Sequence, residues 1–189
     1  MRNTAFLALG LGLIILQSNL FRLVGYLVSL QTELLGSFWD GSIAGITPSL
    51  LLPLIIFMGV HEYSMTRGAA LSFALGYLLD VFAAAPVGLY TFTSVAIFVV
   101  SRVAGVRLAA QTVLTKVALA FAFSLLEGLI IVILTAIFGG DAARPRALAA
   151  LVLPHAFCTA LLAPLVFKLA ERVHQATITV PKPAEVGSR

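Results

Sequence analysis

Long apolar stretches alternate with short polar segments along the chain, and this pattern predicts membrane-spanning helices. The apolar stretches cover about residues 4–21, 48–60, 68–82, 89–103, 117–138 and 147–169. A helix needs about 20 mostly apolar residues to cross the hydrocarbon core of a bilayer. The pattern therefore predicts an all-α membrane protein with a bundle of about six transmembrane helices. They form one polytopic domain over residues 1–172, and a cytoplasmic, disordered tail is expected over 173–189.

Composition narrows the class of protein further. Of the 189 residues, 60% are hydrophobic and 11% are charged, whereas a soluble domain carries about 25% charged residues. A water-soluble protein would need more polar surface, so the composition excludes a soluble globular enzyme and a disordered chain. The single cysteine, Cys158, excludes an intrachain disulfide. The net charge of +4 is explained by basic cytoplasmic loops, so no nucleic-acid partner is expected.

The first apolar stretch follows a short basic start, as the core of a signal peptide does. No small-residue cleavage site follows it, so we interpret it as an uncleaved first span whose helix can continue toward Leu30. Residues 22–46 are mixed in character and are predicted to form an external loop or interfacial segment. Phe38 and Trp39 within it suit the headgroup layer.

The third stretch carries small or polar residues at every fourth position, namely Gly68, Ser72, Gly76 and Asp80. This spacing places them along one side of a helix. Small residues there allow another helix to approach closely in lipid. Two interpretations follow: ordinary packing inside the bundle, or docking of a partner protein's helix.

Asp80 ends the third stretch, where a carboxylate meets the unfavourable end of the helix dipole. The Ala/Pro/Gly turn that follows offers free N–H groups, so Asp80 could accept hydrogen bonds and brace the turn before Pro86 starts the next helix. A contact with a partner protein and an ion or substrate site are the alternatives. Pro48 suits the start of the second helix, since its missing N–H would have no partner there. Pro53 is expected to kink that helix.

Glu127 lies near the middle of the fifth stretch. Burying an ionisable group at that depth is costly unless the group is paired or protonated. His155 in the sixth stretch could be its neighbour, although a lone histidine is more typical of a core position. Two interpretations stay open for Glu127: a neutral carboxyl hydrogen-bonded inside the bundle, or a role in transport or proton movement.

The sequence contains no recognisable catalytic or cofactor-binding motif. His61 and Glu62 begin like the zinc motif HExxH, but the second histidine is missing. Ser-His-Asp and Ser-Lys arrangements, phosphate loops and nucleotide fingerprints are also missing. We therefore expect a protein that is not an enzyme and that has no catalytic residue, cofactor or metal.

Three short segments give the chain a resemblance to the rod shape-determining protein MreD family. These segments are Thr47–Leu52, Ser72–Asp80 and Pro86–Leu89. In that family a proline opens the second helix, a Gly-x-x-x-Asp pattern ends the third, and a glycine follows a short turn. Pro48, Gly76, Asp80 and Gly88 match these positions. The resemblance covers about residues 1–172, and its specific part is 47–90. The long first loop and Tyr77, where an aliphatic residue is usual, depart from the pattern.

The resemblance implies a non-enzymatic scaffold of the bacterial elongation machinery in the cell (inner) membrane. Such a scaffold binds the single-span protein MreC and acts indirectly with MreB and the RodA/penicillin-binding-protein synthase. It supports lateral peptidoglycan synthesis and rod cell shape.

The resemblance also implies a bundle similar to the substrate-binding subunits of energy-coupling-factor transporters. The alternative function is therefore the substrate-binding subunit of a small-molecule, vitamin-type transporter. Such a subunit needs a polar or aromatic pocket that opens outward, for which Glu127, His155 and Trp39 are the suggestive groups. An intramembrane enzyme would need a second catalytic partner, which the sequence does not offer.

The distribution of basic residues predicts that both termini are cytoplasmic. In the six-span arrangement, nine of the 12 Lys and Arg residues fall on the inner side and three on the outer side. The outer three are Arg22, Arg144 and Arg146. A green fluorescent protein fused after Arg189 should fluoresce, and alkaline phosphatase fused there should be inactive. Periplasmic phosphatase activity at that point would contradict the predicted topology.

Overall fold

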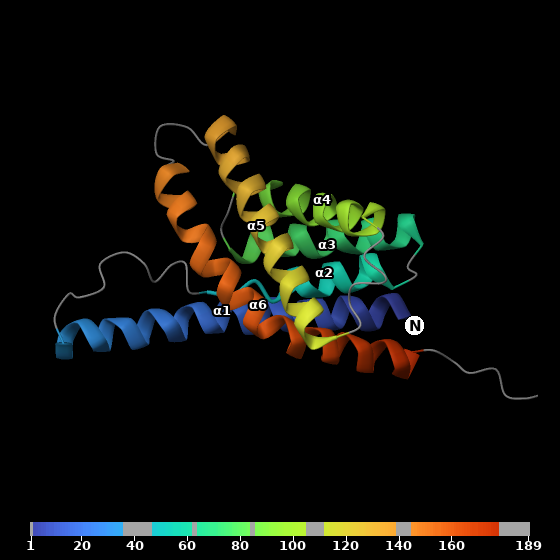
Figure 1. Cartoon of the computed structure of the whole chain (residues 1–189), viewed down its shortest axis with the longest axis horizontal. Coiled ribbons are helices and arrows are strands. Elements are labelled where there is room, and N and C mark those ends of the chain that lie inside the picture. Colours follow the sequence, from blue (N-terminus) through green and yellow to red (C-terminus); the bar gives the residue numbers. More distant parts are fainter. Residues whose placement is uncertain are drawn as a thin grey trace, which may run out of the picture.

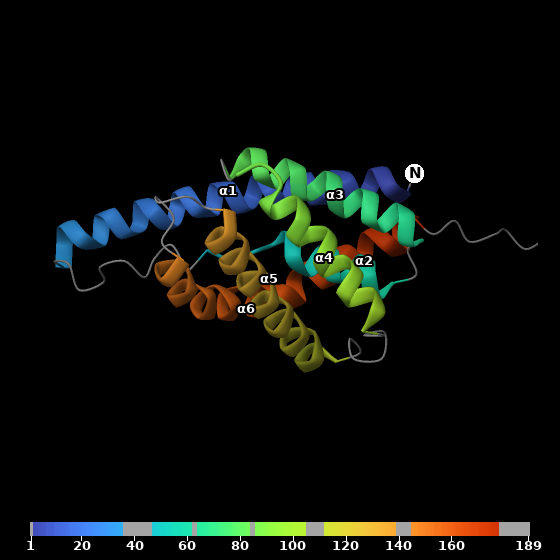
Figure 2. The same ribbon diagram turned by 90° about the horizontal axis from the view of Figure 1, so that it is seen from above.

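α1 and α3 run roughly along the long axis of the molecule, whereas α5 and the first half of α6 are inclined to it (Figures 1 and 2). The start of α1 lies at the same end of the bundle as the end of α6. The computed structural model describes residues 2–35, 47–61, 64–83, 86–104, 112–138 and 145–177. Over these residues the fold is all-helical. The elements are α1 (Arg2–Leu35), α2 (Leu51–Val60), α3 (Met65–Phe82), α4 (Leu89–Val103), α5 (Val113–Phe138) and α6 (Pro145–Thr177).

Each predicted apolar segment contains a helix, but four helices are longer than predicted; α3 begins at Met65 rather than at 68. α1 continues to Leu35, so the first part of the predicted loop 22–46 is helical. α5 begins at Val113 rather than at 117. α6 runs to Thr177, so the predicted disordered tail is wrong over 173–177. The helix persists there because Ala170 is buried in the core and Glu171 pairs with Lys116 of α5 at 3.8 Å. Phe38, Trp39 and residues 178–189 lie outside the described part of the chain.

Three of the helices are long and apolar enough to cross a membrane. They are α1 over Asn3–Leu20, α5 over Val113–Phe138 and α6 over Leu148–Thr177. α2 has 10 residues and would span only about 15 Å. α4 has 15 residues, or about 22 Å, against a hydrocarbon core of about 30 Å.

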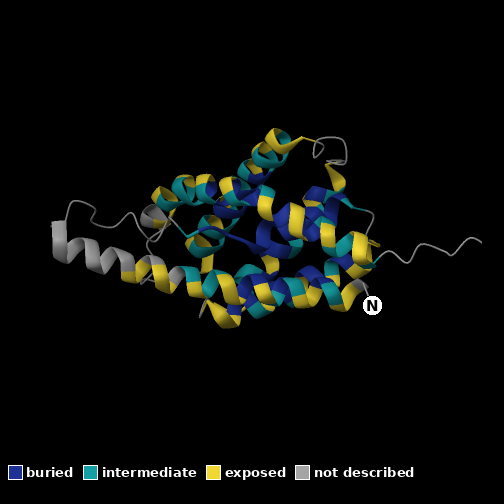
Figure 3. Cartoon of the chain, turned by 90° about the horizontal axis from the view of Figure 1, so that it is seen from below, coloured by how far each residue is buried: buried dark blue, intermediate teal, exposed yellow. Residues whose placement is uncertain are grey.

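The short helix α2 forms the centre of the bundle. All ten of its residues are buried, and it packs against each of the other helices. Its Phe57 ring lies 6.1 Å from Phe6 of α1 and 6.4 Å from Phe167 of α6, measured between ring centroids. Buried residues gather in the middle of the bundle, and exposed ones face outward (Figure 3). α2 can be apolar on every side because protein surrounds it on every side.

Two prolines near α2 act differently from the prediction. The helix begins at Leu51, so Pro48 does not open it. Pro48 lies in the non-helical segment 47–50 that leads into the helix, of which 48–50 are buried. Pro53 stands in the first turn of α2, where backbone N–H groups have no partner within the helix. Pro53 therefore costs α2 no hydrogen bond, and the expected kink loses its physical cause.

α6 curves along its length in both views (Figures 1 and 2). Pro154 and Pro164 lie inside it, and each removes one backbone hydrogen bond and favours bending. The first half of α6 packs along α5, where Phe157 and Phe121 have ring centroids 4.9 Å apart. Phe167, in the second half, reaches the core around α2. The curve thus lets one helix contact both the rim and the centre of the bundle.

The small-residue side of α3 packs against α4. Gly68, Ser72, Gly76 and Asp80 are all buried. A Cβ atom on Gly76 would lie 2.7 Å from the Thr91 Cα and 2.8 Å from the Tyr90 carbonyl oxygen, so the two backbones touch at this point. A methyl group on Gly68 would clash with the ring of Phe98. The interpretation of this stripe as internal packing is therefore confirmed, and no surface remains there for a partner's helix.

Gly76→Ala should destabilise the protein, because the new methyl group meets backbone atoms that cannot rotate away. Overpacking of this kind costs about 1–3 kcal/mol, which corresponds to roughly 3–10 °C in melting temperature for a chain of this size. The measurement is thermal unfolding in mild detergent. Gly12→Ala in α1 is the matched control, since no atom lies within 4 Å of its added methyl group. Equal melting temperatures for the two variants would contradict the close approach of α3 and α4.

Candidate functional site

The carboxylate of Asp80 holds the beginning of α4. Its Oδ1 accepts a hydrogen bond from the Tyr90 N–H at 2.7 Å. Its Oδ2 accepts from the Gly88 N–H at 2.9 Å, the Thr91 N–H at 3.2 Å and the Thr91 hydroxyl at 2.6 Å. Asp80 belongs to the last turn of α3, but its carboxylate contacts the N-terminus of α4, where the helix dipole favours a negative charge. The predicted bracing of the turn is confirmed by these four contacts.

The turn itself needs a glycine. Gly88 is the residue that precedes α4, and its φ of 101° lies in the left-handed region, which residues with a Cβ rarely adopt. The prediction that Pro86 starts the next helix is wrong. Pro86 lies in the turn, where its carbonyl oxygen accepts a hydrogen bond from the Leu89 N–H at 3.1 Å. α4 starts only at Leu89 because the left-handed Gly88 interrupts the helical path.

The beginning of α2 is held in a similar way by side chains from distant helices. Pro48 has no N–H to satisfy. The next two N–H groups donate to side chains: Ser49 to the Thr159 hydroxyl at 2.9 Å and Leu50 to the Gln17 side-chain oxygen at 3.0 Å. Thr159 lies in α6 and Gln17 in α1. Since residues 48–50 are buried, these bonds supply partners that water cannot.

Glu127 is buried beside the same segment, with 7% of its surface exposed. Its Oε1 lies 3.5 Å from the Ser49 hydroxyl, the upper limit of a hydrogen bond. Its Oε2 lies 3.9 Å from the His155 Nε2 and has no hydrogen-bond partner among the described residues. His155 is therefore the neighbour of Glu127, as the sequence suggested. Glu127 is thus hydrogen-bonded inside the bundle through one carboxyl oxygen, and both interpretations of its role stay predictions.

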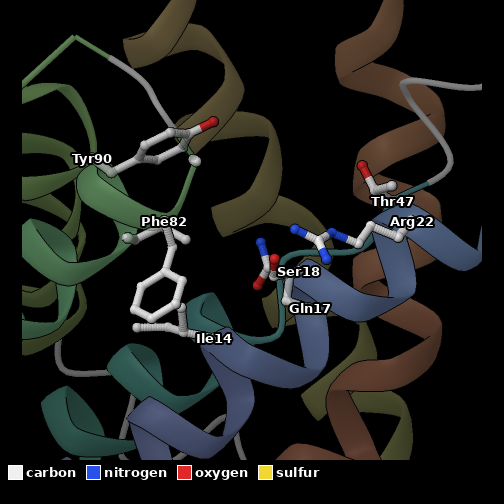
Figure 4. A pocket seen from close by; sticks show the side chains of 9 residues that line it. Ile14, Gln17, Ser18, Arg22, Thr47, Phe82 and Tyr90 are labelled. Atoms are coloured by element: carbon white, nitrogen blue, oxygen red, sulfur yellow. The ribbon is translucent and has the colours of Figure 1, made fainter. Parts of the chain in front are cut away.

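Two adjoining cavities open between these polar groups. The outer one has a volume of about 410 Å³ and is lined by Gln17, Ser18, Arg22 and Thr47 on one side and by Ile14, Leu79 and Phe82 on the other. Tyr90 lies on the same side as Phe82, and its hydroxyl and the Arg22 guanidinium both point into the cavity (Figure 4). The inner cavity has a volume of about 200 Å³ and reaches Glu127 and His155. Gln17, Thr47, Leu79 and Tyr90 line both cavities.

A second cluster of rings lies at the other end of α2. The His61 ring stacks on Phe57 with centroids 3.9 Å apart, and the His174 ring lies 5.7 Å from His61. Burial lowers the pKa of His61 below its ordinary value. No group of three or more His, Cys, Asp or Glu side chains within the described ranges could hold a metal ion.

The residues singled out in the sequence fall into two groups in the structure. Gly76, Asp80, Pro86 and Gly88 form the α3–α4 joint. Glu127 and His155 line the inner cavity, and Pro48 lies in the segment that leads into α2. Ser72 is buried in α3, and its hydroxyl has no hydrogen-bond partner in the described part of the chain. Sequence reasoning missed Gln17, Arg22, Tyr90 and Thr159. The available signal was a polar side chain within or beside an apolar stretch, clearest at Gln17.

Comparison of the chain with family models, with curated proteins and with solved structures finds no match.

Asp80→Asn should destabilise the protein, and Asp80→Leu should destabilise it more. Asn keeps one acceptor but turns an NH₂ group toward an N–H, whereas Leu leaves all four donors without their acceptor. Each buried donor left unpaired costs about 1–3 kcal/mol. Melting temperatures in detergent should therefore follow the order wild type, Asn, Leu. If Asn and Leu were equally damaging at normal protein levels, the charge itself would be needed and the bracing argument would be wrong.

Proposed function

We propose that this protein is a non-enzymatic membrane scaffold of the bacterial elongation machinery, a member of the MreD family that binds an MreC-like single-span protein. It supports lateral peptidoglycan synthesis and rod cell shape from the inner membrane. Through MreC it acts indirectly with MreB and the RodA/penicillin-binding-protein synthase. The observation that carries the proposal is the α3–α4 joint, because the residues of the family resemblance make it.

The strength of that observation is that each matching residue meets a strict physical demand. Gly76 stands where the backbones of α3 and α4 touch. Asp80 supplies the acceptors for four donors of the next helix. Gly88 has a backbone conformation that disfavours other residues. A match at such positions carries more information than a match in hydropathy, which any bundle of apolar helices would give.

A six-span arrangement in the inner membrane with both termini in the cytoplasm is part of the proposal. α1, α5 and α6 supply three candidate crossings. The remaining helices α2, α3 and α4 can complete crossings only where protein covers their ends, since non-helical backbone at membrane depth must be buried. Residues 48–50 meet this condition. The start of α1 and the end of α6 lie at the same end of the bundle (Figure 1). This placement fits an even number of crossings, because such a chain begins and ends on the same side of the membrane.

The small-residue stripe of α3, one candidate for contact with the partner, is occupied by packing against α4. Asp80, the other candidate, uses its carboxylate on the start of α4. Large substitutions at Ser72 or Gly76 would therefore disturb folding before they disturbed docking. Residues 36–46 of the predicted first loop lie outside the described residues.

The cavity supports a second candidate function, the substrate-binding subunit of a small-molecule, vitamin-type transporter. Ligand pockets have volumes of about 300–1,000 Å³ and combine apolar walls with a few polar groups. The outer cavity, at about 410 Å³, has this size and character. In the proposed topology it lies toward the external side, because Arg22 and Thr47 flank the first external loop. Uptake of labelled vitamins in cells that carry the energising subunits would distinguish this function from the scaffold.

The scaffold proposal predicts that the full-length chain co-purifies with the MreC-like protein of the same organism. In lipid, helices associate through close packing and a few polar contacts, so the complex should survive in mild detergent. The measurement is co-elution at a fixed ratio in size-exclusion chromatography. The control is the same partner with its transmembrane segment replaced by a leucine helix, which should no longer be retained.

Loss of the protein should also make a rod-shaped host round, because lateral wall synthesis would lose its membrane anchor. Microscopy of a depletion strain measures this directly. A well-folded protein that never retains the partner, together with a depletion strain that stays rod-shaped, would refute the scaffold function.

A further inference from the structure

We propose that the two adjoining cavities form a binding site for a phosphate ester that carries a nearby N–H or O–H donor, with the phosphate at Arg22 and the donor at Glu127. This chemistry is shared by membrane lipid headgroups and soluble phosphate esters. The inference goes beyond the scaffold function and does not depend on it, because binding needs neither the partner protein nor transport.

The outer cavity has the donors that an oxyanion requires. Arg22 presents a guanidinium that bonds phosphate oxygens through two parallel N–H groups, and it points into the cavity (Figure 4). No carboxylate among the described side chains pairs with it. Gln17 uses its side-chain oxygen on the Leu50 N–H, which leaves its NH₂ group as a donor. The hydroxyls of Ser18 and Tyr90 complete a set that suits a group with several acceptor oxygens.

The inner cavity has the acceptor. Glu127 is more than nine-tenths buried, lines this cavity, and its Oε2 has no hydrogen-bond partner among the described residues. The distance of 3.9 Å to the His155 Nε2 is too long for a hydrogen bond. His155 is an ion-pair neighbour of the Glu127 Oε2 rather than a hydrogen-bond donor to it. An ammonium or hydroxyl group of a ligand would supply the hydrogen bond that this buried oxygen lacks.

The neighbouring polar groups are already occupied by the fold. Asp80 accepts four hydrogen bonds from the start of α4. Thr159 and the Gln17 oxygen hold the start of α2. Arg22 and the Glu127 Oε2 are different because no described backbone group uses them. They lie at the two parts of one joined space, a cation in the outer part and an acceptor in the inner part.

The walls between these groups are apolar. Ile14, Leu79 and Phe82 line the outer cavity, and Ile131, Val132 and Val152 line the inner one. Burial strengthens the hydrogen bond of a ligand to Glu127, whereas Arg22 is exposed. The walls can also accommodate the first carbons of an acyl chain, so a lipid source for the phosphate is compatible with the site.

The test uses the purified full-length protein in maltoside detergent and measures binding by thermal shift and native mass spectrometry. The probes are dihexanoyl phosphatidylethanolamine and dihexanoyl phosphatidylcholine, which share the phosphate and the chains. Only the ethanolamine has N–H donors for Glu127, so it should bind more tightly by about tenfold, the effect of one charge-assisted hydrogen bond. Glycerophosphoethanolamine, which lacks chains, separates the two sources. Binding of it alone indicates a soluble ester, and binding only of the dihexanoyl form indicates a lipid.

Two variants locate the site. Arg22→Gln should weaken both lipids by about tenfold, whereas Arg172→Gln, an exposed arginine of α6, is the matched control and should change neither. Glu127→Gln keeps the shape of the side chain and should reduce the preference for ethanolamine over choline. Each variant is compared at an unchanged melting temperature without ligand. Equal binding of the two lipids by the wild type, unchanged binding by Arg22→Gln, or no binding of any probe would overturn the proposal.

Discussion

The structure depends on one constraint: backbone N–H groups at the start of a helix need acceptors even when no water can reach them. α2 begins inside the bundle, and α4 begins at a partly buried turn beside α3. Asp80 of α3 serves α4, and Gln17 of α1 and Thr159 of α6 serve the residues that lead into α2. These bonds tie the short central helices to the long outer ones, which fixes where each helix starts and how the elements lie around the cavities.

This constraint gives polar residues in an apolar chain two different roles. The side chains that cap a helix accept hydrogen bonds from backbone N–H groups of the same molecule, so these acceptor oxygens already have partners. Glu127 and Arg22 contact no backbone group of this kind in the described structure, although they lie near the same segments. Burial and polarity alone do not separate the two kinds. The difference lies in which hydrogen bonds are made: Asp80 uses both carboxyl oxygens on the start of α4, whereas the Glu127 Oε2 has no hydrogen-bond partner among the described residues.

Local features of the fold could be predicted from the sequence, and long-range ones could not. The apolar stretches predicted the helices, and Asp80 followed by a Pro/Gly turn predicted the brace, because donor and acceptor lie within 11 residues of each other. The small-residue stripe of α3 predicted that another helix approaches closely, but the spacing of the stripe does not identify that helix as α4. The partners of the α2 segment escaped prediction because Ser49 and Thr159 are 110 positions apart. The cavity was missed for the same reason: four distant segments line it.

The complete enclosure of α2 has a consequence for how the protein is made. A ten-residue helix is too short to enter a bilayer as an independent span, and its leading segment stays without an acceptor for the Ser49 N–H until Thr159 of α6 is present. α6 is the last of the six helices to leave the ribosome. The core around α2 can therefore be completed only after the outer helices have been synthesised. α2 is the second helix in the sequence, but it reaches its final environment only when α6 is present. A nascent chain that stalls before α6 would hold a hydrophobic and partly unsatisfied segment, which insertion chaperones and membrane proteases recognise.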